Sequence, residues 1–521
     1  MTSTVPSATT QLSALQLRLV MVGLLTGMFL SGLDGTAVNT ALPVIVGEFG
    51  GLDHIAWVGT AYVLSSTAAT PILGKLSDLY GRRRMFQLSI AVFIVGSVLC
   101  GIAQSLLQLV LARGVQGIGG GGVLAVGFVV VGDLVPPRER GRYSGLITAV
   151  FAAASVCGPL LGGFLVDQLS WRWIFWLNLP LGALGMVVIQ RALRLPFTPH
   201  ARPVDWTGAA LLVGSVSCLL LVTVWGGSEL PWLSTGIGLL VAAGLALGAL
   251  FLWYERRAPE PILPLRLFGN GTYRLVMVIA AFTGVVMFTV SAFMPLFLQT
   301  VTGVSATRSG LLMLPNIIGL TVSSVGCGRV VARTGRYKWL PIVGLSVMTV
   351  GVLVLARLDG GTSRWETGVG LFLVGLGLGA AMPILTVAVQ NAVPFRDLGV
   401  ATSSNHFFRS LGGALGLAAM GALLANRFTA ELAGRLPDHD VEGRDYLSSP
   451  DAIRSLPVPL RGEVVESLAD AVGALFLVCL PLALMCVVVG LFLEELPLRT
   501  TNQVEDDDDV GGEALDVSFS P

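Results

Sequence analysis

Fourteen long apolar stretches constrain this chain more than any other feature of its sequence. A helix needs about 20 apolar residues to cross the hydrocarbon core of a membrane. Only 12% of the 521 residues are charged and 54% are hydrophobic, whereas about 25% of the residues in a soluble domain are charged. We therefore expect an all-α polytopic membrane protein. The predicted spans are 18–42, 56–74, 85–103, 107–132, 143–166, 174–192, 206–225, 233–253, 275–299, 309–331, 340–356, 367–391, 400–425 and 471–493.

Basic residues are distributed unevenly between the two alternating sets of loops. One set of short loops carries eighteen Lys and Arg residues, and the other carries only Arg172, Arg308, Arg357 and Arg364. Because short cytoplasmic loops hold the excess of basic residues, we expect both termini to be cytoplasmic. Thirty Arg against two Lys, with abundant Ala and Gly, favour a GC-rich, bacterial source. The predicted location is therefore a bacterial plasma membrane.

Two pairs of short segments repeat in register along the chain. Residues 74–84 (GKLSDLYGRRR) match 328–338 (GRVVARTGRYK), and 136–141 (PPRERG) match 394–399 (PFRDLG). Parallel six-helix repeats of this kind place a substrate site near the membrane midplane. The predicted organisation is a cytoplasmic tail (1–17), a first half (18–195), a two-helix insert (196–256), a second half (257–495) with a long extracellular loop (427–466), and a disordered acidic tail (496–521).

Asp34 lies near the middle of the first predicted span, within LSGLDGTAVNTALP (30–43). A carboxylate at the membrane centre costs about 2.5–3.5 kcal/mol on insertion scales, so it is rare unless it faces water, a partner or a proton. One interpretation is a proton-carrying acid in a transport path. The alternative is an acid at a helix end that touches lipid headgroups.

The fourth predicted span buries an arginine, Arg113, in LARGVQGIGGGG (111–122). A lone intramembrane arginine needs a carboxylate, carbonyls or water. Asp34 is the one carboxylate that we expect at mid-membrane, so the two are predicted to pair, with Gln116 nearly one turn further on. The glycine run lacks the Gly-Lys-Ser/Thr ending of a nucleotide-binding loop, which argues against ATP. We expect no cofactor and no metal, and a proton gradient as the energy source.

The loop between the second and third spans combines glycines with an acid and a basic cluster. Gly74 and Gly81 permit a close helix approach and a tight reversal, and Asp78 can accept hydrogen bonds from a helix N-terminus or from an arginine. The alternative, a loop that is merely basic because it is cytoplasmic, explains Arg82, Arg83 and Arg84 but not the spacing of the glycines and the acid.

The fifth span contains AAASVCGPLLGG (152–163), with Gly158, Pro159, Gly162 and Gly163 in one apolar helix. Proline bends a helix by freeing a backbone carbonyl, and small residues form a close-packing face between membrane helices. An ordinary kinked helix is the alternative interpretation.

Taken together, these motifs resemble those of the major facilitator superfamily, in particular its fourteen-helix drug:proton antiporter group. GKLSDLYGRRR is similar to the loop signature of the superfamily, LARGVQGIGGGG to its fourth-helix arginine motif, and the segment ending in GPLLGG to the antiporter motif of helix five. LDGTAVNTALP and WRWIFWLNLP (171–180) resemble the first- and sixth-helix signatures of the fourteen-helix exporters. The resemblance covers residues 17–495.

The resemblance implies roles for several of these residues. Asp34 would be the proton site and Arg113 its coupling partner. Asp78 and Arg82 would latch the loop in one conformation, together with Gly74, Gly81 and Arg83. Gly158 and Pro159 would belong to the helix that distinguishes exporters. The second-half loop departs from the pattern, because Ala332 stands where Asp78 stands in the first half, so latching is expected to be asymmetric.

The substrate is predicted less sharply than the fold. The last six spans contain no mid-membrane Asp or Glu, which favours neutral, zwitterionic or anionic amphiphiles over dications, since a bound cation attracts a carboxylate in low dielectric. Arg409 either attracts an acidic group or only binds carbonyls, and His406 either titrates near neutral pH or only packs. Candidate cavity residues are Asn39, Tyr62, Gln116, Asn316, Gln390, Asn405, His406 and Arg409.

The predicted function is proton-coupled efflux of hydrophobic or amphiphilic small molecules by alternating access. The alternatives are export of a lipid or of an endogenous metabolite such as an antibiotic, and a membrane sensor or scaffold that transports nothing. The sequence contains no nucleophile–base set, so an enzyme is not expected. With zero net charge it suggests no nucleic-acid partner. We expect the chain to act as a monomer in the lipid bilayer.

Overall fold

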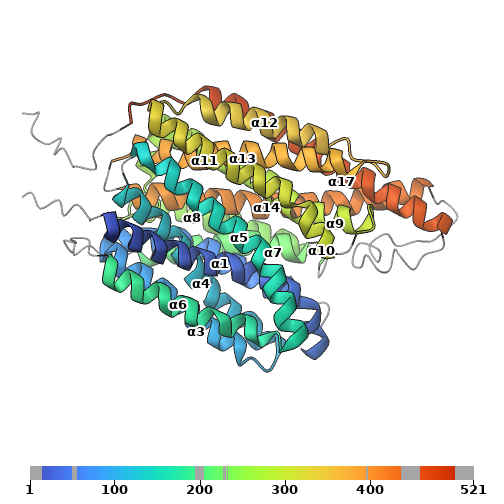
Figure 1. Cartoon of the computed structure of the whole chain (residues 1–521), viewed down its shortest axis with the longest axis horizontal. Helices are drawn as coiled ribbons and strands as arrows, with labels where there is room; N and C mark the ends of the chain where they lie inside the picture. Colours follow the sequence, from blue (N-terminus) through green and yellow to red (C-terminus); the bar gives the residue numbers. More distant parts are fainter. Residues whose placement is uncertain are drawn as a thin grey trace, which may run out of the picture.

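Two bundles of long helices make up the computed structural model (Figure 1). It describes residues 14–49, 56–135, 137–193, 205–226, 230–231, 233–304, 306–394, 397–435 and 458–498. Twelve of the described helices are long and apolar enough to cross a membrane, and the apolar helix Trp339–Leu355 is slightly shorter. The predicted all-α polytopic membrane fold is confirmed. The predicted tails fall almost entirely outside the described residues, although helix α1 already begins at Ala14.

Six helices form the first half of the molecule. α4 packs against α2 and α3, α1 packs against α5 and α6, and α3 packs against α6. Some of these helices begin at a polar N-cap. At the start of α4, the Ser105 hydroxyl accepts a hydrogen bond from the Gln108 backbone amide. The helices are α1 (Ala14–Phe49), α2 (Ala56–Tyr80), α3 (Arg82–Gly101), α4 (Leu106–Leu134), α5 (Pro137–Gln168) and α6 (Arg172–Ala192).

The second half repeats these pairings. α13 packs against α11 and α12, α9 packs against α14 and α17, and α12 packs against α17. The two halves therefore share one architecture. The elements are η2 (Leu265–Gly269), α9 (Gly271–Thr300), α10 (Ala306–Leu312), α11 (Leu314–Thr334), α12 (Trp339–Leu355), α13 (Arg364–Ala392), α14 (Leu398–Arg435) and α17 (Val458–Leu491).

One predicted span, 309–331, is divided between two helices. α10 ends at Leu312 and α11 begins at Leu314, with Pro315 in its first turn. Proline has no backbone N–H to donate to the preceding turn, which is the physical reason for the break.

The predicted extracellular loop 427–466 is shorter than expected. Helix α14 continues to Arg435 and α17 already begins at Val458, so residues 427–435 and 458–466 are helical. Arg435 pairs with Glu466 at 2.7 Å and with Asp470 at 2.6 Å. These ion pairs hold the two helices together beyond the apolar part of the sequence, which a hydropathy window does not detect.

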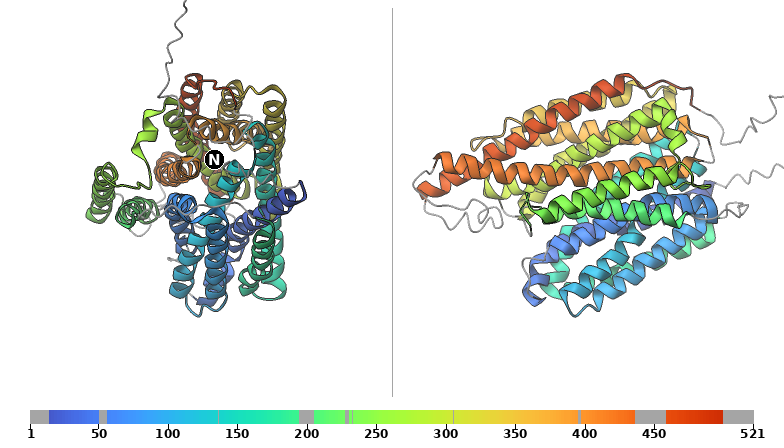
Figure 2. Two further views of the ribbon diagram at one scale, coloured as in Figure 1. Left: turned by 90° about the vertical axis from the view of Figure 1, so that its left-hand side faces the viewer. Right: turned by 180° about the vertical axis from the view of Figure 1, so that it is seen from behind.

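The two-helix insert, α7 (Trp206–Trp225) and α8 (Thr235–Glu255), lies on one flank of the molecule (Figure 2). α7 contacts α2 of the first half and α14 of the second. Two buried carboxylates lie at the ends of the insert, Asp205 just before α7 and Glu255 at the end of α8, and neither was predicted. Asp205 accepts a hydrogen bond from the Gly208 amide and Glu255 one from the Leu263 amide. Both sit at helix ends rather than at mid-membrane.

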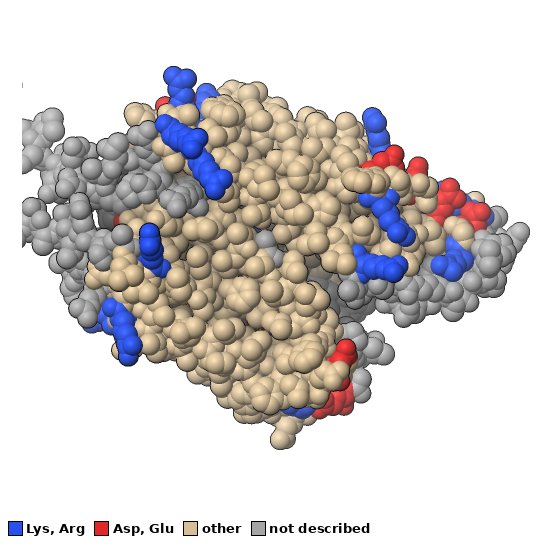
Figure 3. All heavy atoms as spheres, in the orientation of Figure 1, with Lys and Arg blue, Asp and Glu red and all other residues tan. Residues whose placement is uncertain are grey.

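The two halves contact each other at the end where the described chain begins and diverge toward the other end (Figure 1), where Figure 3 shows a hollow between them. α5 packs against α11, and α2 packs against α14. The Thr148 and Ser324 hydroxyls are 3.3 Å apart across this contact. A Cβ on Gly74 would lie 2.5 Å from the Ser403 hydroxyl, so a glycine is needed where α2 meets α14. We call this region the closed end.

A short segment, residues 260–266 (EPILPLR), spans both halves at the closed end, and we call it the strap. Glu260 pairs with Lys75 of α2 at 2.9 Å. Arg266 donates two hydrogen bonds, of 2.8 and 2.7 Å, to the carboxylate of Asp397 immediately before α14. The strap thus connects a helix of each half through ion pairs only six residues apart.

Candidate functional site

Asp34 and Arg113 form a buried ion pair at the centre of the first half. Asp34 lies on α1 and is 1% exposed, and Arg113 lies on α4 and is 2% exposed. Nη1 of Arg113 donates to Oδ2 of Asp34. The predicted pairing is therefore present in the structure, away from any helix end. Two such charges are tolerated in a low-dielectric interior only when their remaining polar atoms are also bonded.

Polar side chains from three helices complete the bonding of this pair. Nε2 of Gln116 donates to Oδ1 of Asp34 at 2.9 Å and to the Ser97 hydroxyl at 2.7 Å. Nδ2 of Asn178, on α6, donates to the same two acceptors at 2.8 and 3.1 Å. Oε1 of Gln116 accepts from Arg113 at 2.5 Å. Both carboxylate oxygens therefore have donors, and α1, α3, α4 and α6 all converge on Asp34.

Helix α2 covers the other side of the guanidinium. Arg113 lies over the ring of Tyr62, with 4.4 Å between Cζ and the ring centroid, and its Nε donates to the Val58 carbonyl at 3.3 Å. The Tyr62 hydroxyl is 2.8 Å from that of Ser31. Tyr62 thus holds the arginine, and its ring face stabilises the positive charge.

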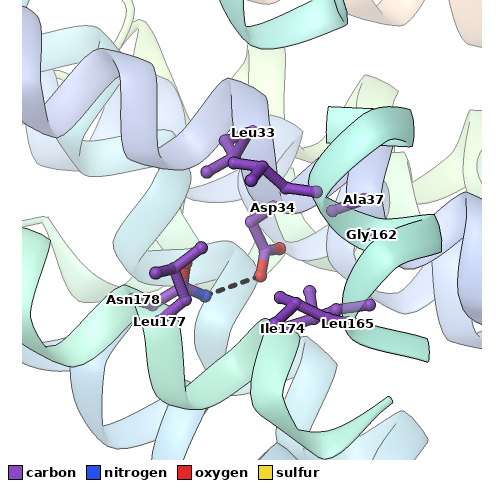
Figure 4. Close-up of a pocket in the computed structure, with 9 residues that line it drawn as sticks. Leu33, Asp34, Ala37, Gly162, Leu165, Ile174, Leu177 and Asn178 are labelled. Atoms are coloured by element: carbon purple, nitrogen blue, oxygen red, sulfur yellow. Dashed lines mark hydrogen bonds between the residues drawn. The ribbon is translucent and has the colours of Figure 1, made fainter. Parts of the chain in front are cut away.

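A small recess reaches Asp34 from between α5 and α6 (Figure 4). Its walls are mostly apolar, with Leu33 and Leu161 among them, and Asn178 points into it beside the acid. It leaves room for about one water molecule and none for a drug-sized ligand. The recess therefore suits the passage of water or protons better than the binding of a substrate.

The predicted helix-five motif packs directly beside the acid. A Cβ on Gly158 would lie 1.9 Å from the Thr36 hydroxyl, and one on Gly162 would lie 2.9 Å from the Ala37 carbonyl. Pro159 lies inside α5. Gly163 differs from its neighbours, because a Cβ there would meet no atom of the described residues within 4 Å. Close packing of α5 on α1 thus requires two of the three predicted glycines.

The loop motif forms a compact ionic cluster at the closed end. Arg82 pairs with Asp78 and donates to Asp133 of α4 at 2.7 Å and to Ser77 at 2.8 Å. Gly81 turns the chain with a φ of 93°, in the region that favours glycine. Arg83 lies half-buried beside it. A Cβ on Gly399 of α14 would lie 2.3 Å from the Asp78 carboxylate, so the cluster presses against the opposite half.

The predicted cavity residues do not gather at one place. Asn39 is exposed on α1. Asn316 donates to the Leu371 carbonyl at 2.9 Å, and Gln390 and Asn405 donate to Thr402 and Thr386, each at 2.9 Å, so these three join helices of the second half. His406 and Arg409 contact each other on α14.

Asn178, Ser97 and Asp133 belong to these clusters and were not predicted. Asn178 stands out as the one amide in WRWIFWLNLP, and this signal could have identified it. Ser97 resembles any small residue of a membrane helix, and no pattern in the sequence distinguishes it. Within the described ranges, no group of three or more His, Cys, Asp or Glu side chains is placed to hold a metal ion.

Comparison with known proteins assigns the family. The model of the Major Facilitator Superfamily matches residues 24–417. The chain belongs to the major facilitator superfamily. Members of this superfamily are transporters rather than enzymes, so the chain is a multi-pass membrane transporter.

The relatives and structures that this transporter matches agree with that assignment. It is 36% identical over 529 residues to the multidrug transporter protein MdtP of Bacillus subtilis, over 96% of this chain and 97% of that protein. It is 33% identical to multidrug resistance protein 3 of Bacillus subtilis, over 94% and 97% of the two chains. The solved proton:xylose symporter XylE shares the fold, with a TM-score of 0.60 and 13% identity over 92% and 97% of the two chains. The predicted resemblance to multidrug exporters of the superfamily is confirmed.

Proposed function

We propose that this transporter exports hydrophobic or amphiphilic small molecules in exchange for protons. The observation that carries the proposal is the buried Asp34–Arg113 pair, with both carboxylate oxygens bonded. An ionisable pair in a membrane interior marks an ion pathway, and relatives over nearly the whole chain are named as multidrug transporters.

The proposed cycle uses the two halves as rocking bodies. With Asp34 deprotonated and the closed end opened, the carrier takes up its substrate on the cytoplasmic side. A proton that enters from outside binds Asp34 and removes the charge that holds Arg113. Gln116, Asn178 and Tyr62 then rearrange their hydrogen bonds, because each contacts this pair. This rearrangement leads to release of the substrate outside and to the return of the carrier to its inward-facing state.

The Asp78–Arg82–Asp133 cluster is the proposed latch of this cycle. It lies at the closed end and presses on Gly399 of the opposite half. Separation of the halves at this end has to remove that contact. We also propose a bacterial plasma-membrane location, cytoplasmic termini and a monomeric carrier, supported by the uneven distribution of basic residues.

The test is transport by purified protein in vesicles with an imposed pH gradient. Asp34→Asn keeps the size of the side chain and one acceptor oxygen but cannot take up a proton. We expect it to abolish gradient-driven efflux while the protein remains inserted and folded. Asp167→Asn, an exposed acid of α5 in the same half, is the matched control and should transport like the wild type. Unimpaired efflux by Asp34→Asn would refute the proposal.

A further inference from the structure

Arg409 carries a positive charge inside the membrane-spanning part of α14. It lies eleven residues after Leu398, which is about 16 Å along the helix at 1.5 Å per residue. The side chain is half-buried. A guanidinium has five N–H donors and stays protonated, and an unpaired charge at this depth is costly. Arg409 therefore needs an anionic or carbonyl partner.

The neighbour of Arg409 on the same helix face is a second donor. Nη2 of Arg409 meets Nδ1 of His406. Because the guanidinium can only donate, Nδ1 must accept, and the proton of the neutral ring then lies on Nε2. Nε2 of His406 is buried and has no hydrogen-bond partner among the described residues. Two donors one helical turn apart are thus left to bind an acceptor.

The carboxylates on the described helices that pack against α14 are engaged elsewhere. These helices are α2, α4, α7, α9, α13 and α17, and α9 has no acid in its sequence. The other acids are Asp78 and Asp133, which pair with Arg82; Asp205, which caps α7; Glu366, which caps α13; and Glu463, Glu466 and Asp470, which pair with Arg435. The structure also shows no hydrogen bond from the described Arg409 side chain to a backbone carbonyl, which was the alternative role.

The two donors lie on the part of α14 that packs against the first half. Phe128 of α4, in the first half, lies against the His406 ring with 4.0 Å between the ring centroids. One turn before His406, Thr402 accepts a hydrogen bond from Gln390 of α13. Phe408, next to Arg409, belongs to an apolar cluster. A few donors on an apolar wall are the usual composition of a small-molecule site.

We infer that Arg409 and His406 bind the acidic headgroup of an amphiphilic substrate, a carboxylate, sulfonate or phosphate, whose apolar body lies between the halves beside Phe128. The inference rests on the proposed function, since it specifies the substrate of the exporter. Charge-assisted hydrogen bonds to a guanidinium are among the strongest in proteins. Asp34, bonded by Arg113, Gln116 and Asn178, has no oxygen left to attract a cationic substrate.

The test measures equilibrium binding, so it needs neither a proton gradient nor turnover. Three dansyl-labelled undecyl chains, ending in a carboxylate, a carboxamide or an ammonium group, are titrated into protein held in phosphatidylcholine nanodiscs. We expect the carboxylate probe to bind at least about tenfold more tightly than the other two. Arg409→Gln should remove this preference and leave carboxamide binding within about twofold of wild type.

Matched variants separate charge from folding. Arg409→Lys keeps the charge and should retain part of the preference, and His406→Gln should weaken it while leaving the arginine in place. Arg427→Gln changes an exposed arginine of the same helix and should bind all three probes like the wild type. Equal affinity for the three probes in the wild type, or an unchanged preference in both Arg409→Gln and His406→Gln, would overturn the inference.

Lipid is a second source of the same headgroup chemistry. Replacing part of the phosphatidylcholine by phosphatidylglycerol distinguishes the two sources. Competition by phosphatidylglycerol that requires Arg409 would support the site and identify a lipid occupant, and absence of competition would support a free amphiphile. If Asp34→Asn keeps efflux while the headgroup preference persists, the proposed proton coupling fails and the binding inference stands.

Discussion

At the scale of single residues, the contact of Asn178 with Asp34 brings a fourth helix to the acid. The amide donates to both Asp34 and Ser97, so α6 cannot shift relative to α1 and α3 without breaking these bonds. Asn178 does not contact a substrate in this arrangement. We regard it as a positioning residue for the proposed proton site.

We predict that Asn178→Ala lowers gradient-driven efflux about tenfold, because the loss of a net hydrogen bond is worth about 1–1.5 kcal/mol. Efflux in vesicles measures the effect, and thermal unfolding checks that the protein remains folded. Asn426→Ala, an exposed amide on α14, is the control. Efflux within twofold of wild type would show that α6 does not position the acid.

The ion pair was predictable from the sequence, and its surroundings were not. The cost of a lone charge in an apolar span points to Asp34 and Arg113 and suggests that they pair. Ser97 and Asn178 are 81 residues apart and Asn178 is 144 residues from Asp34, and a single sequence contains no periodicity that connects such positions. Polar residues of the second half were misleading for a related reason, because Asn316 and Asn405 bond to neighbouring helices instead of lining one cavity.

At the scale of elements, the packing of α5 on α1 depends on glycines at specific positions. Gly158 and Gly162 face Thr36 and Ala37, two and three residues beyond Asp34, whereas Gly163 faces open space. The motif alone does not tell these glycines apart, because the face that each presents depends on the neighbouring helix.

We predict that Gly158→Ala destabilises the protein by about 1–3 kcal/mol, since overpacking forces neighbouring atoms to shift, and that it lowers efflux. Gly163→Ala makes the same chemical change on the same helix and should be close to neutral. Thermal unfolding and efflux of the two variants are compared side by side. Equal effects of both substitutions would contradict the packing argument.

A further element contact joins the end of α1 to the start of α6. The Trp171 indole donates to Glu48 at 2.7 Å and Arg172 pairs with Glu48 at 2.8 Å. The indole hydrogen bond, more than the arginine, holds the pKa of Glu48 below its ordinary value of 4.5, against the opposing effect of burial. Glu48 lies beyond the apolar span that ends at Leu42.

This pKa shift predicts how stability depends on pH. A lowered pKa in the folded state means that the contact contributes fully above about pH 4.5 and loses its contribution as the pH falls through the lower, folded-state pKa. We expect the Tm of the wild type to fall more steeply below pH 4.5 than that of Glu48→Gln. Parallel Tm curves would show that the contact does not stabilise the fold.

At the scale of the whole molecule, the two halves contact each other at the closed end and diverge at the other. The two-half architecture followed from the repeated motifs in the sequence. The full lengths of α14 and α17 did not follow from the sequence, because ion pairs of Arg435 stabilise these two helices outside the apolar spans. The arrangement of the halves depends on contacts such as Gly74 with Ser403, which no local pattern predicts.

We predict that a disulfide between Thr148→Cys and Ser324→Cys holds the closed end shut, since the two native hydroxyls are 3.3 Å apart. Cys327, one turn from Ser324, is replaced by Ala in this background. Oxidation should abolish efflux by the double variant and reduction should restore it, with each single variant unaffected. Efflux that persists in the oxidised, cross-linked protein would show that the closed end need not open.

The strap also limits how far the halves can move apart. Only five residues lie between Glu260, paired with Lys75, and Arg266, paired with Asp397. A fully extended chain of six residues reaches at most about 20 Å, and Pro261 and Pro264 restrict how it can extend. While both ion pairs are intact, the length of the strap therefore limits how far the two halves can separate at the closed end. A substrate that needs a wider passage has to break one of the two pairs.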